Sequence, residues 1–329
     1  MTTGQAEPWT VLRLLKWTTE YFQKRGADSP RLDAEVLLAE ARGCSRIELY
    51  TAFDAEPSPE VREAFREMVR RRGEGTPVAY LVGHKEFYSI ELRVSEATLI
   101  PRPETEHLVI EALDQAKQLR LAEPDRHLRL LDVGTGSGAI AIAIAANLPN
   151  SHVTAVDISP AALEIAKYNV EKHQLDGQIE LLQSDLCAAL DQTQPFDIIC
   201  SNPPYVSEAE YAELHPWVRD FEPQQALVAG PQGTEIIQRV LDEAHPLLVP
   251  GGCCLIELSP MIADATAALV TAHGGYEPAN FIKDLAGHRR ILSTRRVKGE
   301  IAFDAHAACR AFCGVAVAMG SGTAASAGS

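Results

Sequence analysis

From residue 129 onward, short apolar runs alternate with longer stretches of helical periodicity. Strands that are separated by helices pair in parallel, so this alternation predicts an α/β fold with a Rossmann-like, mostly parallel sheet and helices on both faces. A short loop around Gly287 joins the last two runs, which predicts an antiparallel edge strand. The predicted strands are 129–133, 152–157, 179–183, 197–200, 253–258, 276–283 and 289–295, and the predicted helices are 138–147, 159–173, 234–248 and 262–273.

The segment before this alternation has a helical pattern. Apolar side chains recur at helical spacing over 11–22 and 32–41, and Ser58 followed by Pro59 marks the start of a further helix. We therefore expect residues 1–75 to form a small helical bundle. Because they hold no obvious nucleophile and no cluster of ligands, we interpret this bundle as a packing or partner-docking domain.

Three further segments complete the predicted domain organisation. Residues 76–128 are interpreted as a linker with a short hairpin at 87–94, and residues 129–297 as the α/β domain. The remaining residues, 298–329, are rich in Ala, Gly and Ser. Such a composition buries little apolar surface, so we expect a disordered tail.

The charge balance bears on the partner. The 329 residues carry a formal net charge of -15, whereas a protein that holds nucleic acid through its phosphates needs a basic face. We therefore expect a protein or small-molecule substrate and no nucleic acid. The chain has no long apolar run, no signal-peptide pattern and no disulfide framework, so we expect a cytoplasmic protein without a membrane partner. His306, Cys309 and Cys313 lack a fourth ligand, so no metal site is predicted.

The segment 130–138, with the sequence LLDVGTGSG, leads from a predicted strand into a predicted helix. Its glycines permit positive φ and let the backbone approach a ligand. Asp157 ends the next strand, where a carboxylate can bind both hydroxyls of a ribose. Together these features predict a nucleotide-type cofactor rather than a plain tight turn.

Two acidic residues indicate which cofactor this is. The spacing of Gly134, Gly136 and Ala139 would also satisfy a loose dinucleotide fingerprint. Asp132, however, would repel a pyrophosphate and suits the cationic methionine end of S-adenosylmethionine. Asp185 follows the third strand, where it can accept a hydrogen bond from an adenine amino group. We therefore predict S-adenosylmethionine and not NAD. The expected cofactor contacts are Asp132, Gly134, Thr135, Gly136, Ser137, Gly138, Asp157, Asp185, Leu186 and Asn202.

Asn202, Pro203, Pro204 and Tyr205 come directly after the fourth predicted strand, at the edge where open parallel sheets bind ligands. The prolines donate no hydrogen bond. Their carbonyls and the Asn202 side-chain oxygen therefore form a set of acceptors that can hold both N–H bonds of a planar amino group. Tyr205 offers a flat face on which such a group can stack. We predict that all four residues bind the substrate and that Asn202, Pro203 and Tyr205 are catalytic.

Several segments together resemble one protein family. Asn-Pro-Pro-Tyr is typical of methyltransferases that act on amide or exocyclic amino nitrogens. The segment 97–106, ATLIPRPETE, narrows the resemblance to the peptide chain release factor N5-glutamine methyltransferases, which are class I S-adenosylmethionine-dependent methyltransferases. The segments 131–138, 218–223 and 287–290 also match this family, and the resemblance covers about residues 12–295.

The resemblance implies a substrate and a product. The substrate would be a class-1 peptide chain release factor, and the acceptor would be the side-chain amide nitrogen of the glutamine in its Gly-Gly-Gln loop. The product would be N5-methylglutamine. Residues 1–75 would help to dock the release factor. The loop 101–105 would lie near the methionine end of the cofactor or the substrate entrance, without an assigned role for Arg102, Glu104 or Thr105.

The expected mechanism needs no strong base, and none lies beside Asn202 in the sequence. An amide nitrogen is a poor nucleophile because its lone pair is delocalised into the carbonyl. We expect Asn202 and the Pro203 carbonyl to orient the amide in line with the methyl sulfonium, and the proton to leave later to water.

Three other functions compete with this interpretation. An adenine-N6 DNA methyltransferase would use the same tetrapeptide on a flipped base, but it would need a basic target-reading segment, which the chain lacks. A ribosomal-protein glutamine methyltransferase would share the fold, the cofactor and the tetrapeptide, and the segment 101–105 favours the release-factor type. A binding module with a relic cofactor fold would be expected to have lost Asn202 or the glycines, and both remain.

Overall fold

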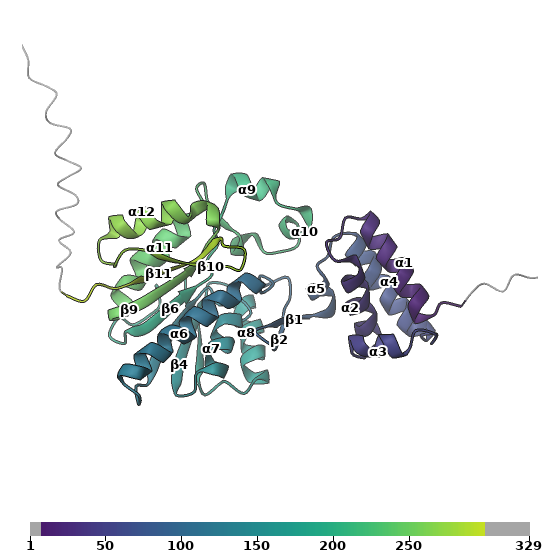
Figure 1. Ribbon diagram of the computed structural model, residues 1–329, viewed down its shortest axis with the longest axis horizontal. Coiled ribbons are helices and arrows are strands. Elements are labelled where there is room, and N and C mark those ends of the chain that lie inside the picture. Colours follow the sequence, from purple (N-terminus) through teal and green to yellow (C-terminus); the bar gives the residue numbers. More distant parts are fainter. Residues whose placement is uncertain (1–7, 300–329) are drawn as a thin grey trace, which may run out of the picture.

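The computed structural model describes residues 8–299. The tail predicted to be disordered lies outside the described residues from residue 300 onward, and so do His306, Cys309 and Cys313. Figure 1 shows two parts, a group of helices near the N-terminus and a sheet covered by helices. No helix in the described part is long and apolar enough to cross a membrane. Within the same residues, no group of three or more His, Cys, Asp or Glu side chains could hold a metal ion.

The N-terminal part is a helical bundle. Its helices are α1 (Val11–Lys24), α2 (Pro30–Arg42), α3 (Arg46–Thr51), α4 (Pro59–Gly73) and α5 (Val78–Val82). Helix α4 starts as the sequence predicts, because the Ser58 hydroxyl accepts a hydrogen bond from the Val61 amide at 3.4 Å. Leu15, Phe22 and Phe65 belong to a hydrophobic core inside the bundle, which is separate from the two cores of the sheet.

The second part is built on a seven-stranded sheet. In chain order its strands are β3 (Leu128–Val133), β4 (Ser151–Asp157), β5 (Ile179–Gln183), β6 (Phe196–Ser201), β9 (Leu248–Glu257), β10 (Asn280–Lys283) and β11 (Arg289–Arg295). They pair in the order β10-β11-β9-β6-β3-β4-β5. Strand β11 runs antiparallel to both of its neighbours, while β5, β4, β3, β6 and β9 are parallel. The predicted mostly parallel sheet with an antiparallel edge is confirmed, and the reversed strand lies one place in from the edge itself.

Helices cover both faces of the sheet (Figure 1). They are α6 (Glu106–Ala122), α7 (Ala139–Asn147), α8 (Pro160–Lys172), α11 (Glu235–Ala244) and α12 (Ala263–His273). Helices α6, α7 and α8 share one hydrophobic core with the sheet, and α11 and α12 share another. No helix was predicted where α6 lies, within the segment 76–128. Its buried face consists of Leu108, Val109, Ala112 and Ala116, whose spacing is typical of a helix.

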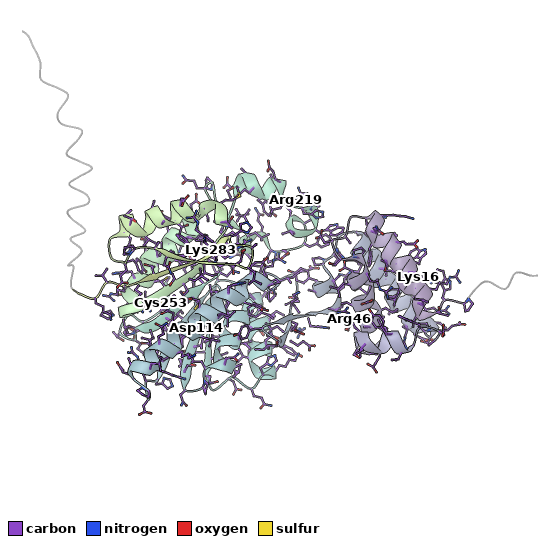
Figure 2. The ribbon with its side chains drawn as sticks, in the orientation of Figure 1. Lys16, Arg46, Asp114, Arg219, Cys253 and Lys283 are labelled. Carbon is purple, nitrogen blue, oxygen red and sulfur yellow. The ribbon has the colours of Figure 1, made fainter. Side chains whose placement is uncertain are left out.

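The chain around Pro250 differs from its prediction. A helix was expected to run to Leu248 and to be closed by 250–252, with a strand starting at Cys253. Instead α11 ends at Ala244, and β9 already begins at Leu248 and includes the predicted breakers. Gly251 has a φ of 80°, and the pairing of β9 with β6 shifts register here, so the strand continues through an irregularity rather than starting after it. Cys253, labelled in Figure 2, lies on this strand.

Between β6 and α11 the chain leaves the sheet and approaches the bundle (Figure 1). This excursion contains β7 (Val206–Ser207), α9 (Glu208–Glu213), α10 (Pro216–Arg219) and β8 (Val228–Gly230). The guanidinium carbon of Arg72, in α4, lies 4.1 Å from the ring centroid of Trp217, in α10. Arg72 also forms an ion pair with Asp33 of α2 at 2.9 Å. The bundle therefore contacts the α/β part through a buried arginine stacked on an aromatic ring.

Candidate active site

A cavity of about 320 Å³ opens where β3, β4, β5 and β6 end, at the carboxyl edge of the sheet. This volume is typical of a small-molecule site, and the position is the one expected for a ligand of an open parallel sheet. Of the predicted site residues, the wall of the cavity contains Gly134, Thr135, Gly136, Ser137, Asp157, Asp185, Leu186, Asn202 and Pro204. The predicted residues that do not line it are Asp132, Gly138, Pro203 and Tyr205.

The glycine loop presents bare backbone to the cavity. Gly134 and Gly136 have φ values of 76° and 56°, and a Cβ added at either would meet no heavy atom within 4 Å. Both the space above them and their left-handed backbone therefore favour glycine and close approach of a ligand. Gly138 differs, because its added Cβ would lie 3.0 Å from the Ile142 side chain. Gly138 thus serves helix packing at the start of α7.

Asp132 lies beneath this loop and is fully buried. One carboxylate oxygen accepts hydrogen bonds from the Thr135 hydroxyl at 2.6 Å and from the Ala141 amide at 3.2 Å. The other oxygen has no hydrogen-bond partner within residues 8–299. Burial raises the pKa of Asp132 to about 7, although both hydrogen bonds lower it. The carboxylate therefore ties the glycine loop to the start of α7 from below.

Asp157 lies in the wall of the cavity at the end of β4. Its two oxygens accept hydrogen bonds from the backbone amides of Gly136, at 2.8 Å, and Ser159, at 2.9 Å. Burial raises its pKa, and these backbone hydrogen bonds oppose that effect. Each carboxylate oxygen keeps a second acceptor position, so the side chain can hold the loop and still accept hydrogen bonds from a ligand.

The third part of the wall follows β5. Asp185 is half exposed and forms an ion pair with Arg239 of α11 at 3.1 Å, and Arg239 itself lines the cavity. Leu186 has a φ of 47°, which places a non-glycine residue in the left-handed region. Such strain persists only where the surroundings impose it, and it is concentrated at functional sites.

The fourth part of the wall is formed by the tetrapeptide after β6. Asn202 lines the cavity, and its side-chain nitrogen donates a hydrogen bond to the Thr105 hydroxyl oxygen at 3.2 Å. Pro203 is buried behind it, and the Tyr205 hydroxyl lies 3.5 Å from a carboxylate oxygen of Glu257. Burial, followed by the charge of Glu257, raises the pKa of Tyr205 well above its ordinary value, so the phenol stays protonated.

The loop 101–105, whose residues had no role assigned from the sequence, closes the cavity from the side. Arg102 lines the cavity and forms an ion pair at 2.5 Å with Glu222, which is buried and lies in the excursion after β6. A second oxygen of Glu222 accepts a hydrogen bond from the Ile100 amide at 3.3 Å. Glu222 thereby ties this loop to the excursion after β6.

Sequence reasoning missed the residues that reach the site from elsewhere in the chain. Nothing in the sequence indicated that Arg239 lines the site, because a charged residue on an amphipathic helix is usually exposed to solvent. Glu222 and Thr105 lay within segments that matched the family resemblance, yet nothing in either segment pointed to the other. Glu257 ends an apolar strand, and its place there was the one available signal, since carboxyl ends of parallel strands carry functional side chains.

Comparisons with known proteins agree with this geometry. Residues 13–83 match the PrmC N-terminal domain family, and residues 108–217 match the methyltransferase small domain family. A release factor glutamine methyltransferase of Rhodopirellula baltica is 60% identical over 294 residues, covering 89% of this chain and 99% of that protein. A release factor glutamine methyltransferase of Salmonella typhimurium is 40% identical over 274 residues, covering 83% of this chain and 95% of that protein.

A likeness to a solved structure concerns the fold. The human Mettl16 catalytic domain, crystallised with a MAT2A 3'UTR hairpin, has a TM-score of 0.52 at 15% identity, covering 71% of this chain and 83% of that one. At this identity the two chains share a methyltransferase-type arrangement of strands and helices, and the likeness says nothing about the substrate of this chain.

Proposed function

This chain belongs to the release factor glutamine methyltransferases, and we propose that it methylates the side-chain amide nitrogen of the glutamine in the Gly-Gly-Gln loop of class-1 release factors. The observation that carries the proposal is that the glycine loop and Asn202 meet in the wall of one cavity. A cofactor on the loop would therefore lie beside the group that binds the amide. The family membership supports the choice of a release factor as the partner.

We propose S-adenosylmethionine as the methyl donor. The open backbone at Gly134 and Gly136 fits a ligand that lies directly on the loop, and the Asp157 carboxylate fits the ribose hydroxyls of a nucleoside. Asp185 lines the same cavity, and we propose that it accepts a hydrogen bond from the adenine amino group. When bound, this cofactor supplies an electrophilic methyl group on a cationic sulfonium. The Asp157 carboxylate, which lines the cavity, contributes negative charge close to the loop, and this charge favours a cation and disfavours a pyrophosphate.

The residues after β6 then act on the substrate amide. The Asn202 oxygen and the Pro203 carbonyl accept its N–H bonds and hold the nitrogen in line with the methyl group. Positioning of this kind supplies several kcal/mol of a reaction barrier, and fixed acceptor dipoles stabilise the positive charge that develops on nitrogen. Tyr205, the last residue of the tetrapeptide, stays protonated. The proton can leave the product nitrogen to water after transfer.

We propose further that the N-terminal bundle docks the release factor, and that the enzyme works in the cytoplasm. The described residues of the bundle form a core of their own and none of them lines the cavity, which supports a role in binding the partner rather than in methyl transfer.

One assay tests the proposed function. Radiolabelled S-adenosylmethionine is incubated with the enzyme and, in separate reactions, a class-1 release factor, a ribosomal protein and duplex DNA. We expect label in the release factor, located by tandem mass spectrometry on the glutamine of the Gly-Gly-Gln loop, and no label when that glutamine is replaced by alanine. Label only in the ribosomal protein or in DNA would contradict the proposal.

A further inference from the structure

The Asn202 side chain is held by a residue far away in the sequence. Thr105 ends the short 3-10 helix η1 (Pro103–Thr105) at the start of α6, and the residue is 4% exposed. Its hydroxyl oxygen accepts the hydrogen bond from the Asn202 amide nitrogen at 3.2 Å. Thr105 thus contacts the predicted substrate-binding group directly, from the loop whose residues had no assigned role.

A buried carboxylate stands behind this contact. Glu257 is the last residue of β9 and is 2% exposed. Because Ile256 pairs with Ser201 across β9 and β6, Glu257 and Asn202 follow these partners at the same edge of the sheet. The Glu257 carboxylate accepts a hydrogen bond from the Thr105 hydroxyl and lies 3.5 Å from the Tyr205 hydroxyl. Its second oxygen has no hydrogen-bond partner within residues 8–299.

The chemistry of these groups gives the contacts a direction. An ionised carboxylate can only accept hydrogen bonds, so the single hydroxyl proton of Thr105 goes to Glu257. The Thr105 oxygen is then left to accept, and only the nitrogen of the Asn202 amide can donate to it. The Asn202 oxygen is therefore the end that remains for the substrate.

We propose that Glu257 and Thr105 are positioning residues that fix the Asn202 amide with its oxygen toward the substrate glutamine. The inference rests on the proposed function, because it concerns the orientation of the acceptor that binds the amide. In free solution the two ends of an asparagine amide exchange by rotation about one bond, and a reversed Asn202 would present N–H groups to the N–H groups of the substrate. Fixing the rotation thus preserves the acceptor that methyl transfer needs.

The ionisation of Glu257 makes this arrangement sensitive to pH. Burial raises the pKa of Glu257 to about 7. The charged and titratable groups that face it are Glu104 on η1, which raises the pKa, and Arg290 on β11, which lowers it. Hydrogen bonds from Thr105 and Tyr205 lower it further. Once protonated, Glu257 can donate to Thr105, whose proton can then go to the Asn202 oxygen. Turnover should therefore be full above the pKa and fall as the pH drops through about 7.

The first test removes the Thr105 hydroxyl. Thr105→Val should lower kcat about tenfold at saturating cofactor, the size expected for losing a hydrogen bond that a charged group supports. The KM for the release factor should change little, because docking involves other surfaces. Thr105→Ser should restore most of the activity. The matched control is Thr266→Val, which removes a buried hydroxyl in α12 whose hydrogen-bond partner within residues 8–299 is the Ile262 carbonyl.

The second test uses the carboxylate. Glu257→Gln should lower kcat at pH 8, and kcat of this variant should no longer fall as the pH drops through about 7. The control is Asp197→Asn, at the other end of β6, which should keep the pH dependence of the wild-type kcat. In an Asn202→Ala background, Glu257→Gln should cost nothing further, because its effect passes through Asn202. Melting temperatures of all variants separate these effects from misfolding.

Two results would overturn the inference. One is a Thr105→Val enzyme that is folded and keeps the wild-type kcat. The other is that Glu257→Gln lowers kcat by the same factor in the wild-type enzyme and in the Asn202→Ala background. Either would leave the proposed function untouched. A wild-type enzyme that fails to methylate the release factor would instead contradict the proposed function itself.

Discussion

The cavity has two walls that are built in different ways. The cofactor wall consists mainly of backbone and of residues close in sequence, such as Gly134, Gly136 and Asp157. The amide wall consists of the side chains of Thr105 and Asn202, which are far apart in the sequence, and the buried Glu257 supports them from behind. The first wall is local in the chain, and the second exists only after the sheet and η1 have come together.

This difference teaches what each wall can tolerate. A backbone wall depends on the shape of one loop, so substitutions that leave the loop intact should change cofactor affinity gradually. A wall of cooperating side chains depends on the direction of every hydrogen bond, so a single change at Asn202 should remove its function. The two walls should therefore respond to mutation in different measurements, and the following predictions test this separation from the largest expected effect to the smallest.

The largest effect is expected at Asn202. Asn202→Ala should lower turnover on the release factor by roughly two to three orders of magnitude, by analogy with removing one preorganised hydrogen-bonding group from an active site. Asn202→Asp keeps an acceptor of similar shape and should therefore retain more activity than the alanine variant. Single-turnover rates at saturating cofactor measure both. Equal rates for wild type and Asn202→Ala would exclude Asn202 from the mechanism.

A smaller effect is expected from a substitution at Asp157, and it should appear in the affinity for the cofactor. Asp157→Ala should weaken S-adenosylmethionine by about ten- to a hundredfold, because a hydrogen bond to a charged group contributes about 1.5–3 kcal/mol. Isothermal titration calorimetry measures the dissociation constant, with NAD as the ligand that should not bind. Asp157→Asn serves as the control for the loop, since it keeps one acceptor. Tight binding of NAD without binding of S-adenosylmethionine would contradict the cofactor assignment.

The two walls also differ in how far they could be predicted. The strand, the glycines and Asp157 lie within about one βαβ unit, so their order along the chain already predicts that they meet. Asn202 was predicted from its place after a strand. The partners of Asn202 could not be predicted. Thr105 lies 97 residues away from Asn202 in the chain, and Glu257 comes to the same edge of the sheet as Asn202 only because β9 pairs with β6. The irregular start of β9 and helix α6 were missed because breakers and a linker were given more weight than apolar spacing.

The bundle should affect neither wall. Arg72→Lys keeps a charge beside Asp33 but loses the planar stack on Trp217. Such a stack contributes about 0.5–1 kcal/mol, so the KM for the release factor should rise about two- to fivefold through a looser bundle. Cofactor affinity should stay the same. The control is Arg66→Lys, an exposed pair with Glu63 on α4. A changed dissociation constant for S-adenosylmethionine would connect the bundle to the cofactor wall.

The smallest effect is expected from the tail. Residues 300–329 are rich in Ala, Gly and Ser, and the Rhodopirellula baltica relative aligns over 99% of its own length while 89% of this chain is covered. A chain that ends at Gly299 should therefore keep the melting temperature, cofactor affinity and turnover of the full chain. Loss of activity or of folding in this truncated chain would show that the tail contributes to one of the walls.

The most direct test of two walls with separate tasks is a crossed measurement on wild type, Asp157→Ala and Asn202→Ala. For each protein, calorimetry gives the dissociation constant of S-adenosylmethionine, and single-turnover methylation of the release factor at saturating cofactor gives the transfer rate. We expect Asp157→Ala to weaken binding and largely keep the transfer rate, and Asn202→Ala to lower the transfer rate far more than it weakens binding. A proportional loss of both quantities in both variants would contradict the account.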